Sequence, residues 1–233
     1  MEDGPKPVRL GLLAAQIAGM FLVIGLALFL AAGTVAWAPG WIFLGLFLGF
    51  TIALSVWLLR HDPGLLTERM TGIGKRDQKR WDKVFFALAN LLFFGWLVVM
   101  PLDAVRFHWS HVPVWLHAAG GLLLVASLWL FFLVFRANAY LSPAVRVQAE
   151  RGHRVVTTGP YAVVRHPMYA VDALFLLATT LLLGSWAGLL PAFLLVVATA
   201  VRAVAEERTL RAELAEYDEY MRRVRYRMIP HVW

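Results

Sequence analysis

The chain has 233 residues, of which 60% are hydrophobic and 16% are charged, and its formal net charge is +7. Soluble domains are about 45–50% apolar and about 25% charged, so this composition excludes a disordered protein, a coiled coil and most soluble enzymes, and it indicates a membrane protein. The chain has no cysteine, which excludes disulfides, a thiolate nucleophile, an iron–sulfur cluster and cysteine-ligated zinc.

Five apolar stretches follow one another along the chain, at residues 10–32, 41–59, 84–101, 114–135 and 168–201. A membrane-spanning helix needs about 20 apolar residues. The last stretch has 34 residues and reads LGSWAG at 183–188, which is typical of a turn with an interfacial tryptophan. We therefore predict a tight helical hairpin there, and an all-α polytopic membrane bundle of six spans.

The basic residues alternate between the predicted connections. Two precede the first span, seven lie at 60–83, five at 136–166 and seven at 202–233, whereas the other connections hold one in total. The positive-inside rule then places both termini in the cytoplasm, and we expect an integral protein of the inner (cytoplasmic) membrane that contacts membrane lipids. Because the topology explains the positive charge, no nucleic-acid partner is expected. The first span is also too long to be the apolar core of a signal peptide.

Asp172 lies inside the last apolar stretch. A carboxylate within a membrane span is costly and is by default a candidate for function. The alternative is that it lies near the cytoplasmic end of its span and reaches the interface.

Residues 145–169 mix charged, glycine, threonine and aromatic residues before they enter the membrane. Pro167 is expected to be the first residue of a helix. Helix starts have unpaired N–H donors and a positive dipole end, so Arg165, His166 and this helix start predict a site for an anionic or carboxylate-bearing ligand. The alternative is an interfacial belt in which Tyr161 and Tyr169 anchor the chain and Arg165 contacts lipid head groups.

The segment after the hairpin places Arg202 and Glu206 four residues apart, on one face of a helix. The spacing of Leu210, Leu214 and Tyr217 predicts that the last span continues as an amphipathic cytosolic helix. The alternative for the charged pair is an ordinary ion pair. The neighbouring charged residues are expected to face solvent: Glu207, Arg208 and Arg211.

Several motifs of known chemistry are missing from the sequence. It has no P-loop, no HExxH and no GxSxG, and the GxG at 72–74 is interpreted as a loop. His108, His111 and His117 have no carboxylate nearby except Asp103, so no metal site is expected. An enzyme of this sequence would depend on a diffusible cosubstrate.

The motif at 153–169 (HRVVTTGPYAVVRHPMY), the apolar hairpin after it, and Glu206-Glu207 with Leu210 and Tyr217 resemble the isoprenylcysteine carboxyl methyltransferase family, in a short bacterial-type form. The resemblance is strong over residues 138–233 and looser back to 62–66 and 80–82. It implies an integral membrane enzyme that uses S-adenosylmethionine, with a single domain over 1–233. Within it, four spans occupy 1–136, and the cofactor-binding and catalytic core occupies 137–233 with its hairpin at 168–201.

The resemblance also implies site residues. Arg202 and Glu206 would be catalytic and, with Asp172, would contact the acceptor. The residues implied at S-adenosylmethionine are Gln148, His153, Arg154, Val155, Val156, Gly159, Tyr161, Arg165, His166, Pro167, Met168 and Tyr169.

The implied reaction transfers a methyl group to a lipophilic or prenylated acceptor from the bilayer, with an isoprenylcysteine-like carboxylate as the expected head group. Two departures from the family are Val171, where it often has glycine, and Asp172. A carboxylate at this spacing after HPxY is similar to sterol-type reductases, which use NADPH. That reductase, a phospholipid N-methyltransferase and a non-catalytic transporter or assembly factor are the alternatives.

Overall fold

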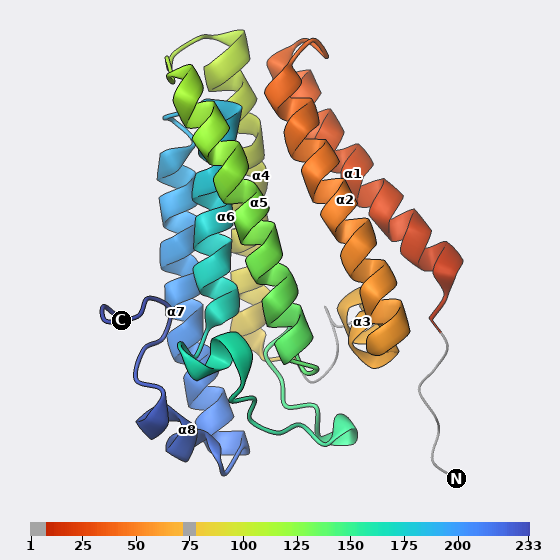
Figure 1. The fold of residues 1–233 in the computed structure, drawn as a ribbon, viewed down its shortest axis with the longest axis vertical. Helices are drawn as coiled ribbons and strands as arrows, with labels where there is room; N and C mark the ends of the chain where they lie inside the picture. The colour runs from red at the N-terminus through yellow and green to blue at the C-terminus, as the bar shows by residue number, and fades with distance from the viewer. Residues whose placement is uncertain (1–7, 72–77) are drawn as a thin grey trace.

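The computed structural model describes residues 8–71 and 78–233 (Figure 1). Within these ranges all regular secondary structure is helical, with no strand, so the predicted all-α membrane bundle is confirmed. The GxG at 72–74 lies outside the described residues. The α-helices are α1 (Leu10–Ala32), α2 (Ala38–His61), α3 (Pro63–Thr71), α4 (Arg80–Pro101), α5 (Val114–Ala137), α6 (Pro167–Leu183), α7 (Leu189–Glu213) and α8 (Tyr217–Arg223).

Two layers make up the bundle. Helices α4, α5, α6 and α7 stand side by side, and α1 and α2 form a slanting pair against them (Figure 1). The closest pair is α5 and α6, because Gly120 has no side chain. A methyl group there would lie 2.8 Å from the carbonyl oxygen of Ala178. Small residues allow membrane helices to approach in this way.

The predicted spans agree with the helices. Five of the described helices are long and apolar enough to cross a membrane, and α6 is a shorter apolar helix of 17 residues, at the lower limit of about 17 for a span. The predicted hairpin turn is confirmed, because α6 ends at Gly184, which has φ of +80°, and α7 begins at Leu189. Glycine adopts this left-handed conformation without strain.

Asp103 fastens α4 to this hairpin turn. It lies in a short π-helix, Leu102–Arg106, that extends α4, and its side chain is fully buried. The carboxylate accepts hydrogen bonds of 2.6 Å from the hydroxyls of Ser110 and Ser185 and one of 3.1 Å from the N–H of Ala187. Its role in the described structure is therefore to hold the ends of three helices together.

The helix predicted to continue to Tyr217 is interrupted, and that prediction was wrong in part. Helix α7 ends at Glu213 and α8 begins at Tyr217. The turn between them brings the apolar residues of the stripe into a cluster with the buried Tyr220 and Val224, packed on Val155 of the preceding loop. This cluster lies at the same end of the bundle as α3 (Figure 1).

Candidate active site

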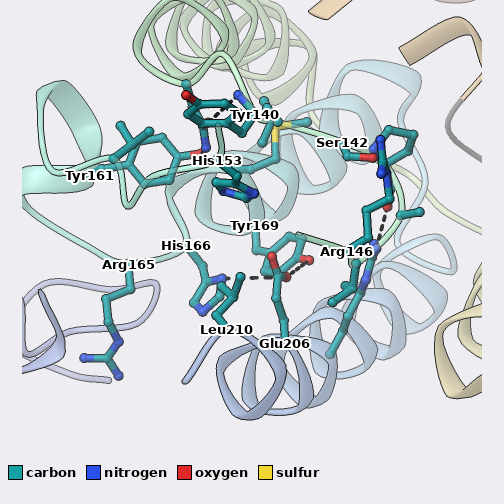
Figure 2. A pocket seen from close by; sticks show the side chains of 18 of the residues that line it. Tyr140, Ser142, Arg146, His153, Tyr161, Arg165, His166, Tyr169, Glu206 and Leu210 are labelled. Carbon is teal, nitrogen blue, oxygen red and sulfur yellow. Dashed lines mark hydrogen bonds and ion pairs between the residues drawn. The ribbon is translucent and has the colours of Figure 1, made fainter. Parts of the chain in front are cut away.

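A cavity of about 250 Å³ lies where the loop between α5 and α6 meets the first turn of α6, the C-terminal half of α7 and α8. Its lining combines aromatic rings with charged side chains (Figure 2). The residues predicted for the site that line it are His153, Val155, Val156, Tyr161, Arg165, His166, Met168, Tyr169, Asp172, Arg202 and Glu206.

The start of α6 forms one wall, as the sequence predicted. Pro167 is the first helical residue and His166 is the cap residue before it. A helix leaves the N–H groups of its first turn without partners inside the helix, and its dipole favours a negative charge at this end. The His166 ring lies parallel to that of Tyr169, with centroids 5.4 Å apart. The wall can therefore receive a carboxylate beside a flat aromatic surface.

The loop before α6 supplies a second aromatic pair. The rings of Tyr140 and His153 stack 4.5 Å apart (Figure 2). Behind them, the fully buried Gln148 donates a hydrogen bond of 2.7 Å to the carbonyl of Tyr140, and its backbone N–H donates to Nδ1 of His153 at 3.2 Å. Burial, with the nearby charges of Arg151 and Arg146, lowers the pKa of His153 to about 4. His153 is therefore neutral at pH 7.

Tyr161 closes the cavity between these two walls. Its hydroxyl accepts a hydrogen bond of 2.9 Å from the side chain of Asn138, and its carbonyl accepts one of 2.8 Å from the hydroxyl of Tyr220. Burial raises the pKa of Tyr161, which keeps the phenol protonated. Tyr161 and Arg165 are only 8% and 7% exposed, so the alternative of an interfacial belt is wrong for both.

The guanidinium of Arg165 turns away from the cavity toward the C-terminal segment (Figure 2). It donates 2.7 Å hydrogen bonds to Glu207 and to the carbonyls of Val224 and Arg225. Glu207 also accepts from Arg227 at 2.9 Å. The prediction that Glu207 faces solvent was therefore wrong, because this carboxylate is 3% exposed and joins α7, the α6 start and the C-terminal segment.

The two predicted catalytic residues have different partners from those expected. Glu206 accepts a 2.6 Å hydrogen bond from the hydroxyl of Tyr169 (Figure 2). Arg202 forms its described ion pair with Asp82 of α4, at 3.0 Å, and donates to the carbonyl of Pro143 at 2.6 Å. The simple Arg202–Glu206 ion pair, the alternative for this helix face, is therefore not what the described structure contains.

Aromatic rings surround the same guanidinium. It lies 4.9, 4.7 and 5.8 Å from the ring centroids of Phe85, Phe86 and Tyr169. These are distances at which cations and aromatic faces attract. Nε of Arg202 is buried without a hydrogen-bond partner among the described residues. Of the guanidinium nitrogens only Nη2 has a described hydrogen-bond or ion-pair partner, so Arg202 is held from one side and has donors left to meet a ligand.

Asp172 lies on α6 one turn beyond Met168 and borders the cavity. Among residues 8–71 and 78–233 the structure gives it no hydrogen bond or ion pair. Arg69 of α3 borders the same part of the cavity and interacts electrostatically with it. The position of Asp172 at a cavity supports the interpretation that it serves function over the interpretation that it only reaches the interface.

Four of the predicted residues do not line the cavity. Gln148 supports it from behind, Arg154 is exposed, Gly159 begins the 3-10 turn that holds Tyr161, and Pro167 sets the start of α6. Sequence reasoning missed Arg69 and Tyr140, which line it. Tyr140 stood in a basic loop with other aromatics, which offered a weak signal, whereas nothing in the sequence related Arg69 to Asp172, 103 residues away.

Comparison with known families agrees with this geometry. Residues 115–216 match the model of a family described as phospholipid methyltransferase. The match runs from α5 to the turn before α8 and so includes the loop, the α6 start and both predicted catalytic residues. Over the segment that builds most of the cavity, the chain is therefore similar to phospholipid methyltransferases, and this similarity with its apolar helices supports a membrane methyltransferase.

Proposed function

We propose that the protein transfers a methyl group from S-adenosylmethionine to the head group of a lipophilic acceptor. The observation that carries the proposal is the meeting, in one cavity, of an open helix start at His166, an aromatic surface at Tyr169 and the carboxylate of Glu206. The family match over residues 115–216 supports the same reaction type.

The residues of the cavity fit the cofactor chemically. His166 and the first-turn N–H groups of α6 would hold the carboxylate of S-adenosylmethionine, and the Tyr169 ring and Glu206 would face its positive sulfonium. The Tyr140–His153 stack offers a flat surface for adenine. The bound cofactor supplies an electrophilic methyl group, so the protein needs no nucleophile of its own. Its contribution is alignment and the exclusion of water.

The first candidate acceptor is a carboxylate, as in an isoprenylcysteine. Arg202 is fixed by Asp82 through Nη2 and can donate from its remaining guanidinium N–H groups to one carboxylate oxygen. The other oxygen would form the new bond to the methyl carbon while the carbon–sulfur bond breaks and its electron pair passes to sulfur. The carboxylate is ionised at pH 7 and becomes a neutral ester, so this reaction needs no base.

The second candidate is an amine, as in a phospholipid head group. The observation that favours it is Asp172, a carboxylate at the cavity with no described partner. Asp172 would attract the ammonium form and accept its proton, leaving the nitrogen lone pair free to attack the methyl carbon. The description of the matched family is in keeping with this acceptor.

The test is calorimetric titration of the purified protein with S-adenosylhomocysteine, and with NADPH in parallel. We expect micromolar binding of S-adenosylhomocysteine, weakened at least tenfold in His166→Ala, which removes a proposed contact to the carboxylate, and unchanged in Glu213→Gln, an exposed acid at the end of α7. Binding of NADPH alone would instead identify a reductase.

Radiolabelled S-adenosylmethionine then distinguishes the two acceptors. The protein is incubated with a membrane lipid extract, and the labelled product is treated with mild alkali. A methyl ester releases labelled methanol, whereas an N-methyl group survives. No label in lipid, despite cofactor binding, would contradict a lipophilic acceptor.

A further inference from the structure

A second cavity, of about 410 Å³, lies between the α1–α2 pair and the rest of the bundle. We call it the α1–α2 chamber. Its volume is within the range of about 300–1,000 Å³ that is common for ligand pockets. Most of its lining is apolar, with side chains such as Ile17 and Met20 of α1, Phe47 and Leu54 of α2, and Phe175 of α6.

The chamber and the candidate active site share three residues. Arg69, Met168 and Asp172 border both cavities. The two spaces therefore meet at the inner end of the chamber, next to Tyr169 and Arg202, which face the place where methyl transfer is proposed. The head group of an occupant at this end of the chamber would therefore lie beside that place.

Polarity changes along the chamber in one direction. Thr51 donates its hydroxyl hydrogen to the carbonyl of Phe47 at 2.8 Å, and Gln16 donates to the carbonyl of Met70 at 3.3 Å. These polar groups are thus satisfied within the protein. Arg69 and Asp172 remain as the charged end of a chamber whose other lining residues are uncharged.

Arg69 is held loosely enough to serve a ligand. Its guanidinium lies 4.8 Å from the Phe135 ring and its one described hydrogen bond, to the carbonyl of Leu141, is 3.5 Å long. That length is at the weak end for such bonds. The site therefore presents a cation and an anion that form no hydrogen bond or ion pair with each other among the described residues, at the point where an amphiphile would place its head.

The place of the chamber among the apolar spans indicates which part of an amphiphile it would hold. The chamber lies between apolar spans whose outer faces are exposed, for example at Leu22 and Ile52. Its lining on α2 runs from Phe47 to Leu58, which is about 16 Å at the rise of an α-helix. An apolar space of this length, inside a membrane, suits a hydrocarbon chain and offers water few partners.

We infer that the α1–α2 chamber binds the hydrocarbon chain of the methyl acceptor, with the acceptor's head group at Arg69 and Asp172. This inference rests on the proposed methyl transfer and adds to it the place and chemistry of the second substrate. It also assigns a role to α1 and α2, which lie outside the matched family segment. The pair forms one wall of the acceptor site, and its packing sets which chains fit.

The experiment fills the α1–α2 chamber with a larger side chain and leaves the residues of the cofactor cavity unchanged. Thr51→Trp places a large ring inside the chamber, and Ile52→Trp places the same ring on the outer face of the same helix, where Ile52 is 47% exposed. Ser55→Phe, a smaller filling of the chamber, is the second variant in case Thr51→Trp does not fold. Each variant is titrated with S-adenosylhomocysteine and assayed for methyl transfer to a membrane lipid extract.

A photoreactive palmitic acid that carries a diazirine in its chain is the direct probe of the chamber. After irradiation, labelled peptides are located by mass spectrometry. We expect label on the inner faces of α1 and α2, at least a fivefold loss of label in Thr51→Trp, and no loss in Ile52→Trp. Methyl transfer should fall at least tenfold in Thr51→Trp, with the affinity for S-adenosylhomocysteine unchanged within twofold.

The outcomes separate the two proposals. Normal methyl transfer in both chamber variants, with or without loss of label, would overturn the inference and leave the methyltransferase intact, because the chamber would then hold only a structural lipid or nothing. If the wild-type protein binds no S-adenosylhomocysteine, the proposed function fails, and the inference about its acceptor fails with it, whatever the label shows.

Discussion

The two sides of the candidate active site differ in whether their charged side chains have partners within the protein. On the side of the C-terminal segment, Glu207 accepts hydrogen bonds of 2.7 and 2.9 Å from Arg165 and Arg227, and its carboxylate also lies 3.3 Å from Nε2 of His166. On the side of the α1–α2 chamber, Asp172 has no described hydrogen bond or ion pair, and Arg69 has a long bond to a carbonyl and lies over the Phe135 ring. Buried charges are costly unless they are paired. The charged side chains on the first side therefore stabilise one another, whereas those on the second side would be stabilised by a bound ligand.

The largest expected effect is on the paired side. Glu207→Ala leaves the guanidinium of Arg165 buried without its anion, and breaking such a pair costs about 3–5 kcal/mol. We expect a fall of many degrees in the thermal unfolding midpoint in detergent and loss of S-adenosylhomocysteine binding, because the α6 start loses its support.

The control for Glu207→Ala is Glu213→Gln on the same helix. Glu213 pairs with Lys79 at 2.6 Å, but its side chain is 36% exposed. Exposed pairs contribute about 0–1 kcal/mol, so this variant should be close to wild type. Equal destabilisation by both changes would show that the buried cluster has no special role.

The variants with the next largest expected effect test whether Arg202 has a structural role, as Glu207 does, or contacts a ligand. Its pair with Asp82 suggests structure, and its free Nε suggests ligand contact. Arg202→Ala should lower kcat/KM for methyl transfer about 100-fold, the size expected when a positioned group is lost. Asp82→Asn keeps Arg202 and should cost about tenfold, mainly in kcat, because the guanidinium is less firmly placed. Equal losses in both variants would indicate a purely structural pair.

Substitution of Gly120 tests the close packing of α5 on α6, the helix that the two sides share. Helices α5 and α6 touch through this glycine, and a methyl group would meet the α6 backbone at Ala178. Overpacking of this kind costs about 1–3 kcal/mol. Gly120→Ala should lower the thermal midpoint, and Gly121→Ala, whose methyl group would have only a side-chain contact of 3.7 Å, should not.

The sequence predicted the parts of this architecture that depend on local pattern. The spans, the turn at Gly184 and the helix start at Pro167 follow from apolar length, glycine and proline, and all three are confirmed. The environment of Glu207 was not predictable in this way, because a charged residue among other charged residues on a helix resembles a solvated face. Its burial depends on a C-terminal segment that folds back to pair with Arg165.

Residues of different helices that lie close together could not be predicted from the sequence either. Asp82 and Arg202 lie on different helices, and so do Arg69 and Asp172. A single sequence gives the period of each helix but not which residues of two helices meet. The predicted site residues of the motif gathered at one cavity, whereas Asp82 of α4, which pairs with Arg202, and Arg69 of α3, which lines the cavity, lie outside the motif.

The smallest expected effect concerns His153, which lies on neither charged side and is kept neutral by its surroundings. Burial and the charges of Arg151 and Arg146 lower its pKa from 6.5 to about 4. The unfolded chain therefore binds a proton at His153 at a higher pH than the folded protein does. Stability falls as the pH decreases from about 6.5 to 4, and this contribution is constant above and below that window.

His153→Gln removes this titration and keeps a polar side chain in the stack with Tyr140. The thermal midpoint of the wild-type protein, measured in detergent from pH 7.5 to 4, should fall more steeply below pH 6.5 than that of the variant. Parallel curves would mean that His153 is protonated as easily in the folded protein as in the unfolded chain. The same variant lacks the ring beside which adenine would stack, so it should also bind S-adenosylhomocysteine more weakly at pH 7.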